Sequence, residues 1–292
     1  MQSGRRRGQP AWLLRGVHAQ AEEPQLERQA PEILRIATTL AALAFAAQAA
    51  CAPATIDTDG PDFVESSEVV GKGRFQFEAD VVAERDRRSP ARITTLGTPT
   101  LLRFGVTDTV ELRVETEGAQ RVIDHNGTGT TAGGSGDTAF GVKWHTQDRD
   151  RATNTPAVSW ILHFETPSGT GQFEGHGVTP SLRSVITWEL PHDLALGFMP
   201  GIRYGSTPDG KRFASAISGL VLNKQWTETL RTFVENSAQQ IARAADGGVV
   251  MSWDAGAAYL LSKDWQIGMR AGVAANKNTP GNQVLFELAG RF

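Results

Sequence analysis

Ionisable side chains of both signs recur at alternate positions through most of the chain, and they are its main candidates for chemistry. Glu111, Arg113 and Glu115 are spaced by two, as are Glu78 and Asp80. In an extended chain such residues share one face, because successive side chains point to opposite sides. A face of this kind can bind or repel charged solutes, or form ion pairs across strands. The full candidate set is Arg74, Glu78, Asp80, Arg103, Glu111, Arg113, Glu115, Lys143, His163, Glu165, Arg183, Glu189, Arg203, Arg231, Asp254, Arg270 and Glu287.

Hydrolysis would ask more of these residues, because it needs a nucleophile, a base and an orienting group that converge. Ser159 and His163 share a face of one predicted strand. They are four positions apart, which at a rise of about 3.3 Å per residue separates them by more than about 10 Å. The sequence offers no convergent set, so we assign no catalytic residue and expect no enzyme.

Sequence signals for metal ions, phosphate groups and nucleic acid are weak. The glycine-rich stretch from Gly127 to Asp137 lacks the GK[ST] of a phosphate loop, and we expect an outer loop there. His125 and His176 have no metal-ligand spacing, and Cys51 is the only cysteine. A formal net charge of -3 gives no basic footprint for nucleic acid. We therefore expect no cofactor, no metal site and no nucleic-acid partner.

The N-terminal region predicts export. Arg35 precedes an apolar run over about 36–47, and AQA at 47–49 provides the small-residue pattern of a signal-peptide cleavage site. The run is too short for a mature transmembrane helix. We assign 1–50 to a signal peptide carrying an extension that a start codon placed too early would explain; a buried amphipathic helix is the alternative. The glutamine three residues before Cys51 disfavours lipidation of that cysteine.

Beyond residue 50, apolar and polar residues alternate with period two, and turn residues interrupt the alternation. Residues 51–71 precede the first strand and are predicted to form a periplasmic lead. The pattern predicts twelve strands, at 73–84, 92–105, 110–117, 136–147, 156–167, 180–190, 194–204, 211–223, 227–236, 247–261, 265–275 and 283–292. Runs of about ten residues, tilted in a barrel, have the length that spans the hydrocarbon layer of a membrane.

The connections between these strands alternate in length. Short ones, such as VTDT, PHD, KQW and SKD, follow even-numbered strands, whereas longer ones follow odd-numbered strands; DRDRATNT after the fourth is the exception. Short turns on one side and long loops on the other are typical of an outer-membrane barrel with both termini in the periplasm.

Tryptophans cluster near the short-connection ends of the predicted strands, where indole rings favour the bilayer interface. These tryptophans are Trp144, Trp160, Trp188, Trp226 and Trp265, while Trp253 lies in mid-strand. A closed barrel is the only sheet that leaves no unpaired backbone in lipid. We therefore predict an all-β fold, an up-and-down antiparallel transmembrane β-barrel of about 12 strands over residues 72–292, with outer-membrane lipid against its apolar face.

The last predicted strand ends on an aromatic residue. Its outward positions are Val284, Phe286, Leu288, Gly290 and Phe292. The terminal aromatic resembles the C-terminal signature of bacterial outer-membrane proteins, which their assembly machinery reads. This resemblance implies that the barrel-assembly machinery is a partner through Phe292. Gly290 stands where a bulky residue is usual.

Several stretches resemble the family of meta-pathway phenol-degradation transporters, which are outer-membrane β-barrels. The segment from Thr55 to Asp80 is similar to that family's opening, although Gly60 replaces the arginine of its acidic TDRPD motif. LLRFGVTDTVELRV, GDTAFGVKW and PAVSWILHFETPSG resemble three further strands. The resemblance implies uptake or efflux of small, often aromatic, molecules.

We therefore expect an outer-membrane channel or transporter for small, hydrophobic or aromatic solutes, with the charged face lining its lumen. A structural or adhesive barrel with a plugged lumen, in which the same charges only fill the interior, stays open as the alternative. A barrel hydrolase is the third hypothesis. Whether the lumen is open or plugged, most of its charged residues should form ion pairs, and Glu111 or Glu115 is expected to pair with Arg103.

Overall fold

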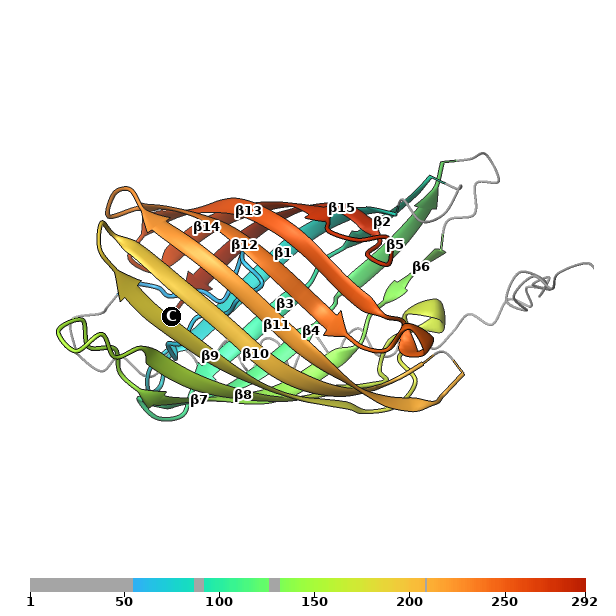
Figure 1. Ribbon diagram of the computed structural model, residues 1–292, viewed down its shortest axis with the longest axis horizontal. Coiled ribbons are helices and arrows are strands. Elements are labelled where there is room, and N and C mark those ends of the chain that lie inside the picture. The colour runs from blue at the N-terminus through green and yellow to red at the C-terminus, as the bar shows by residue number, and fades with distance from the viewer. Residues whose placement is uncertain (1–54, 87–91, 126–131, 208) are drawn as a thin grey trace, which may run out of the picture. The chain divides into compact units, whose positions relative to one another are not determined.

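The strands of this chain close into one antiparallel ring (Figure 1). The computed structural model describes residues 55–86, 92–125, 132–207 and 209–292; the predicted signal peptide and residues 127–131 of the glycine-rich stretch lie outside them. Each strand pairs with its neighbours in chain order, and β15 pairs with β1 to complete the ring. Within the described residues, no helix is both long and apolar enough to cross a bilayer.

Over the residues that the structure describes, the ring contains fifteen strand segments and two short 3₁₀ turns. The strand segments are β1 (Phe75–Asp86), β2 (Ile93–Gly97), β3 (Thr100–Gly105), β4 (Val110–Thr116), β5 (Ala119–Asp124), β6 (Ala132–Ser135), β7 (Thr138–Gln147), β8 (Ala157–Thr166), β9 (Thr179–Leu190), β10 (Leu194–Ser206), β11 (Arg212–Gln225), β12 (Leu230–Ile241), β13 (Val249–Ser262), β14 (Trp265–Ala274) and β15 (Gly281–Arg291). The 3₁₀ turns are η2 (Gly171–Phe173) and η3 (Ala244–Asp246).

Three pairs of these segments are halves of single interrupted strands. β2 and β3, β4 and β5, and β6 and β7 each follow one another along the same line, so the fifteen segments form twelve strands. This confirms the predicted strand number and up-and-down order. One predicted connection was wrong, because the stretch after 110–117 contains β5 and β6 where a loop was expected. β5 and β6 continue the neighbouring strands beyond their interruptions, which a period-two pattern broken by Gly118 does not reveal.

The interruptions lie side by side and form a crease across the sheet. Asp80 N donates to Pro99 O over 2.8 Å, Thr98 N donates to Ala119 O over 3.1 Å, and the Gly136 N donates to Gly118 O over 2.8 Å. The hydrogen-bond ladder therefore runs on across the crease. Gly118 has a φ of 65°, and a Cβ at this position would lie 2.0 Å from Thr98 O. Only glycine fits there without strain.

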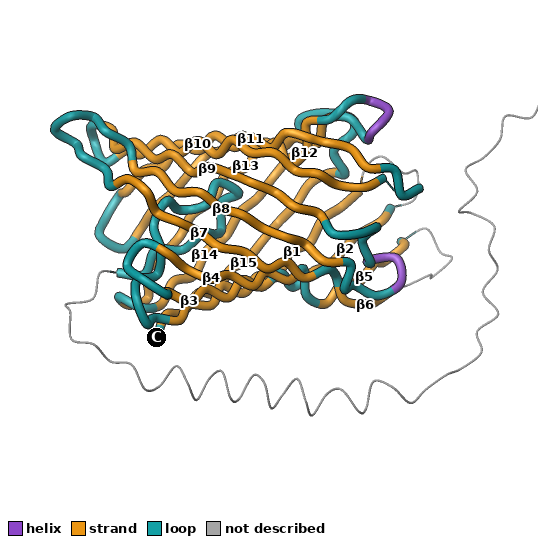
Figure 2. Tube along the Cα trace, turned by 90° about the horizontal axis from the view of Figure 1, so that it is seen from below, coloured by secondary structure: helices purple, strands orange, loops and turns teal. Residues whose placement is uncertain are grey.

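The alternation predicted from the sequence sorts apolar side chains to the outside of the ring. Leu112, Val142 and Leu162 are exposed, whereas their neighbours Arg113, Lys143 and His163 are buried in the interior. The C-terminus lies at the end of the barrel that carries the short turns (Figure 2). The exposed aromatic residues near this end are Phe104, Trp144, Trp160, Trp226, Tyr259 and Phe292, whereas Tyr204 and Trp253 lie toward the other end. Trp144 pairs with Trp160 at the short-turn end.

The departure at Gly290 has a packing reason. Its backbone passes between two rings, and an added Cβ would lie 2.7 Å from Phe77 and 3.0 Å from Trp265. Both rings also contact the terminal Phe292, with centroid separations of 6.3 Å for Phe77 and 6.0 Å for Trp265. The glycine thus makes room for an aromatic group that joins the last strand to the first.

Candidate functional site

Residues 55–70, the plug segment, lie inside the ring of strands (blue in Figure 1). Carboxylates on three strands of the wall accept hydrogen bonds from its backbone. Glu78 of β1 accepts from Asp59 N over 2.8 Å, and Glu111 of β4 accepts from Val70 N over 2.9 Å. Glu235 of β12 accepts from Phe63 N over 2.8 Å. We expected 51–71 to form a lead on the periplasmic side, but from Thr55 onward this stretch fills part of the lumen. It lies there because its polar groups find their partners on the inner wall.

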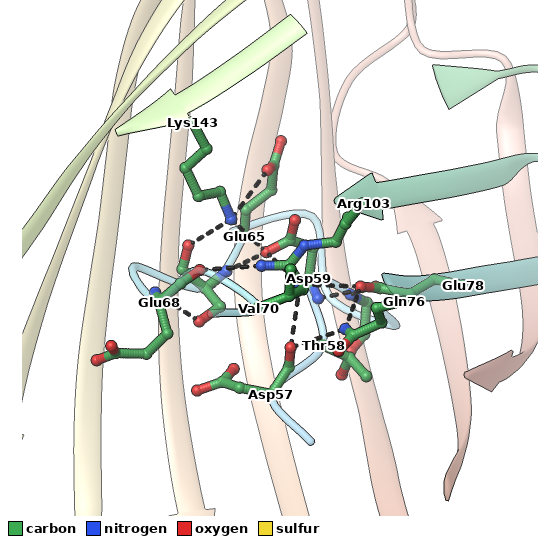
Figure 3. Close-up of polar contacts among 12 residues, drawn as sticks. Asp57, Thr58, Asp59, Glu65, Glu68, Val70, Gln76, Glu78, Arg103 and Lys143 are labelled. Atoms are coloured by element: carbon green, nitrogen blue, oxygen red, sulfur yellow. Dashed lines mark hydrogen bonds and ion pairs between the residues drawn. The ribbon is translucent and has the colours of Figure 1, made fainter. Parts of the chain in front are cut away.

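The plug segment inserts two carboxylates into a cluster of wall cations (Figure 3 shows part of it). Asp59 lies 2.6 Å from Lys143 and 2.5 Å from Arg113. Glu65 lies 2.7 Å from Arg113 and 2.7 Å from Arg183. Burial favours the neutral form of Asp59, but the neighbouring cations outweigh it and hold the pKa of that carboxyl well below its usual value. The plug segment is therefore fastened by ionised pairs.

Arg103 joins the plug segment to two wall strands. It makes a bidentate pair with Glu111 over 2.9 and 3.0 Å and a further bond to Glu78 over 3.0 Å. Its remaining donors reach the backbone carbonyls of Asp57 and Glu68 in the plug segment. The expected pairing of Arg103 with Glu111 is confirmed. Arg103 is fully buried, so its charge would be costly without partners. These five bonds, two of the partners being carboxylates, compensate that charge.

The opposite side of the plug segment is apolar. Val64, with Phe63 beside it, packs against one strip of the inner wall. This strip, the apolar strip, consists of Ile161, Val185, Met199, Val221 and Phe233 on β8 to β12. Further along the wall, Arg231 makes a bidentate pair with Asp62 over 3.0 Å to each oxygen. The lumen at this level is therefore cationic on one side and largely apolar on the other.

Most of the remaining predicted lumen residues make their contacts along the wall, whereas Glu287 lies against Gly60 of the plug segment. Arg203 pairs with Glu165 over 2.9 Å, and half-exposed Glu115 lies 3.4 Å from His163. Asp254 accepts from Ser237, Arg270 donates to Gln283, Glu287 accepts from Gln266, and Glu189 pairs with Arg149. Arg74 and Asp80 are partly buried on β1 or just before it. The structure thus brings together around the plug segment Glu78, Arg103, Glu111, Arg113, Lys143, Arg183, Arg231 and Glu287.

A serine, a histidine and an aspartate meet at the short-turn end. Ser159 Oγ lies 3.4 Å from His145 Nδ1, and His145 Nε2 lies 2.8 Å from Asp148. Both Ser159 Oγ and His145 Nδ1 are bonded to the carbonyl oxygen of Ser67 in the plug segment. A carbonyl only accepts, so Nδ1 carries a proton and does not act as a base toward the serine. Ser159 is also fully buried, and the group serves to fasten the plug segment.

A cavity of about 740 Å³ lies between the plug segment and the β9–β14 wall. Val64, Glu65 and Asp62 line it on the plug side. Gly197 and Val221 are among its wall residues, and the turns after β9 and β11 contribute its outer rim. The cavity therefore opens toward the short-turn end and reaches the point where Glu65 and Val64 meet the wall.

Sequence reasoning missed the plug carboxylates Asp59, Asp62 and Glu65. Their one sequence signal is the acidic run DTDGPDFVESSE directly before the first strand. The predicted inner faces of β3, β4 and β7 carry more basic than acidic residues. A search of the sequence for the missing acidic partners would have pointed to this acidic run.

Solved structures with a similar fold are outer-membrane barrels. The crystal structure of an outer membrane channel from Pseudomonas putida F1 matches with a TM-score of 0.60 and 12% identity, over 80% of this chain and 99% of that one. The KdgM porin gives 0.45 and 9%, over 74% and 98%, and the CymD monoaromatic hydrocarbon channel gives 0.40 and 10%, over 75% and 87%. No curated protein matches in sequence.

The family model described as "Putative MetA-pathway of phenol degradation" matches residues 58–292. This match begins within the plug segment and runs through every strand of the ring to the C-terminus. It therefore covers the barrel and most of the plug segment as one unit, and the chain belongs to this family.

Proposed function

We propose that this protein is an outer-membrane channel for small solutes whose lumen is gated by the plug segment. The observation that carries the proposal is the position of residues 55–70, inside a closed ring with an apolar exterior and an ionic interior. The plug segment belongs to no strand and is held by side chains and single backbone bonds. A segment held in this way can move without opening the ring.

Membership of a family described by phenol degradation supports small aromatic or hydrophobic molecules as the solutes. The apolar strip offers such molecules a surface inside the lumen. In this proposal the solute binds the apolar strip inside the lumen and is then released. The proposed activity is transport rather than catalysis, because the serine, histidine and aspartate that meet near the short turns are bonded to the plug segment.

The proposed location is the outer membrane of a Gram-negative cell, reached through the signal peptide assigned to residues 1–50. The exposed apolar band and the aromatic residues at its short-turn edge support contact with lipid. Extraction of the outer membrane and comparison of unheated with boiled samples on a gel tests this. A mobility shift on boiling supports a folded barrel there, and a soluble, unshifted band contradicts it.

Single-channel conductance in a planar bilayer tests the function. Glu115 is half-exposed inside the lumen, so Glu115→Lys should lower the preference for cations over anions. Asp108→Lys, in the exposed turn between β3 and β4, makes the same charge change outside the lumen and provides the control. Absence of conductance steps, or equal selectivity in both variants, would contradict the proposal.

The number of bonds that hold the plug segment favours a second candidate, a structural barrel with a permanently filled lumen. The two functions differ in one property, namely whether the plug segment must move for solute to pass. A disulfide that fixes the plug segment to the wall separates them.

A further inference from the structure

The plug segment presents a particular chemical shape to the wall. Phe63 and Val64 pack on the apolar strip, and the next residue, Glu65, places its carboxylate between Arg113 and Arg183. Three consecutive residues thus combine an apolar body with a carboxylate head. The apolar strip of the wall contacts the apolar part, and Arg113 and Arg183 of the wall bind the carboxylate.

The wall cations at this point take most of their ion-pair partners from the plug segment. Arg103 is compensated by Glu78 and Glu111 of the wall itself. Lys143 and Arg183 instead take Asp59 and Glu65 from the plug segment, while Arg113 adds only a 3.3 Å contact with Glu111 on the wall. Buried cations of this kind are costly without an anion, so departure of the plug segment creates a demand for another one.

Two of these cations retain spare donors. The Nε atoms of Arg113 and Arg183 are buried, and among the described residues neither has a hydrogen-bond partner. The site therefore has more donor capacity than the plug carboxylates use, and a planar guanidinium is well suited to bind a carboxylate through two donors.

The cationic and apolar parts of the wall adjoin one another. Ile161 of β8 pairs with Lys143 of β7 on one side and with Arg183 of β9 on the other. Val185 lies two positions beyond Arg183, on the same face of β9. A ligand whose head binds the cations therefore lays its body along the apolar strip.

A solute can reach this place from the cavity already described. The cavity is lined by Val64, Glu65 and Val221, and its volume of about 740 Å³ lies within the usual range for sites that hold one small molecule. A molecule in the cavity lies against the two residues whose contacts it would replace.

We propose that Arg113, Lys143 and Arg183, with the adjoining apolar strip, form a binding site for an apolar carboxylate, which the plug segment's own Phe63-Val64-Glu65 occupies in this structure. A solute of this class displaces the plug carboxylate and releases the plug segment. This inference rests on the proposed channel function and names its substrate class.

The test follows exposure of the plug segment in the full-length folded protein. Ser67→Cys, in a Cys51→Ser background, puts one buried thiol in the plug segment, and its reaction with a maleimide reports release. Benzoate at about ten times its Kd should raise the labelling rate about tenfold, because it binds only the released state. Benzamide, which has the same ring without the charge, and acetate, which has the charge without the ring, should leave the rate unchanged.

Substitutions at Arg183 and Arg231 distinguish loss of benzoate binding from a weaker attachment of the plug segment to the wall. Arg183→Gln should raise the basal labelling rate and abolish the response to benzoate. Arg231→Gln, which removes the plug ion pair with Asp62 elsewhere on the wall, should raise the basal rate and keep the response. Glu65→Gln weakens the internal competitor and should lower the half-maximal benzoate concentration.

Equal responses to benzoate and benzamide, or a benzoate response that survives Arg183→Gln, would overturn the inference. Conductance steps in the same preparation without any benzoate response would overturn it too, while leaving the channel function standing. A benzoate response without conductance steps would support the site and contradict the channel.

Discussion

The ammonium of Lys143 lies 2.6 Å from the carboxylate of Asp59, although the two residues are 84 positions apart in the chain. Both are buried, one on the inner face of β7 and the other in the plug segment. This contact, with those of Arg113 and Arg183, joins a stretch without secondary structure to a wall of strands. The lumen is thus organised around ion pairs between the plug and the wall.

Arg103 should be far more important for stability than Arg203. Arg103→Met leaves Glu78 and Glu111 buried without their partner, which we expect to cost about 3–5 kcal/mol of unfolding free energy. Arg203→Met removes a half-exposed pair with Glu165, which we expect to cost about 0–1 kcal/mol. Urea titration of the heat-modifiable gel band measures both. Equal shifts of the two midpoints would show that Arg103 is not the buried hub described here.

A charged residue in place of Leu162, on the outer face of the barrel, should destabilise the fold in lipid. Leu162 lies in the middle of β8, paired with Val142, and both are exposed on the outside of the ring. Leu162→Arg should cost about 2–4 kcal/mol of folding free energy in lipid vesicles, and Thr107→Arg in a short turn about 0–1 kcal/mol. Folding yield into vesicles of defined composition measures the difference. A tolerated Leu162→Arg would place water rather than lipid against this face.

The crease should depend on Gly118. Gly118→Ala forces a side chain into a left-handed backbone and against Thr98 O, which we expect to cost about 1–3 kcal/mol. Gly133→Ala is the matched control, because a Cβ there meets only Gln120 O at 3.7 Å. Urea midpoints of the two variants should differ clearly. Indistinguishable midpoints would mean that the strands relax around the crease without cost.

Phe292 should have a role in assembly beyond its packing. Phe292→Ala and Phe77→Ala each remove one ring from the same aromatic group, so their purified proteins should refold into detergent with similar stability. In cells only Phe292→Ala should reduce the amount in the outer membrane, because only it alters the C-terminal signal. Quantitative blotting of membrane fractions measures this. Equal loss in both variants would assign the effect to packing alone.

The strands were predictable because period-two alternation is local, and each strand from β8 to β15 lies within a few residues of its predicted bounds. β5 and β6 were missed because Gly118 and Gly136 interrupt the pattern there. The wall residues of the site were predictable from face parity, since Glu111, Arg113 and Lys143 fall on the inner face. Their partners were not, because no local pattern links Asp59 to a lysine 84 residues away.

A covalent lock on the plug segment tests the central claim most directly. In a Cys51→Ser background, Val64→Cys and Gly197→Cys bring two thiols together, since a Cβ at Gly197 lies 3.1 Å from Val64 Cγ1, which suits a disulfide. Val221→Ala makes room for that Cβ, which would otherwise lie 2.7 Å from Val221. Single-cysteine variants control for oxidation itself.

The measurement is the swelling rate of liposomes that contain this variant, in an isotonic solution of a small neutral sugar. We predict that the oxidised protein gives the rate of protein-free liposomes, and that reduction with dithiothreitol restores swelling. Equal swelling before and after reduction would contradict a plug segment that moves to open the lumen. No swelling in either state, with or without benzoate, would favour the permanently filled barrel.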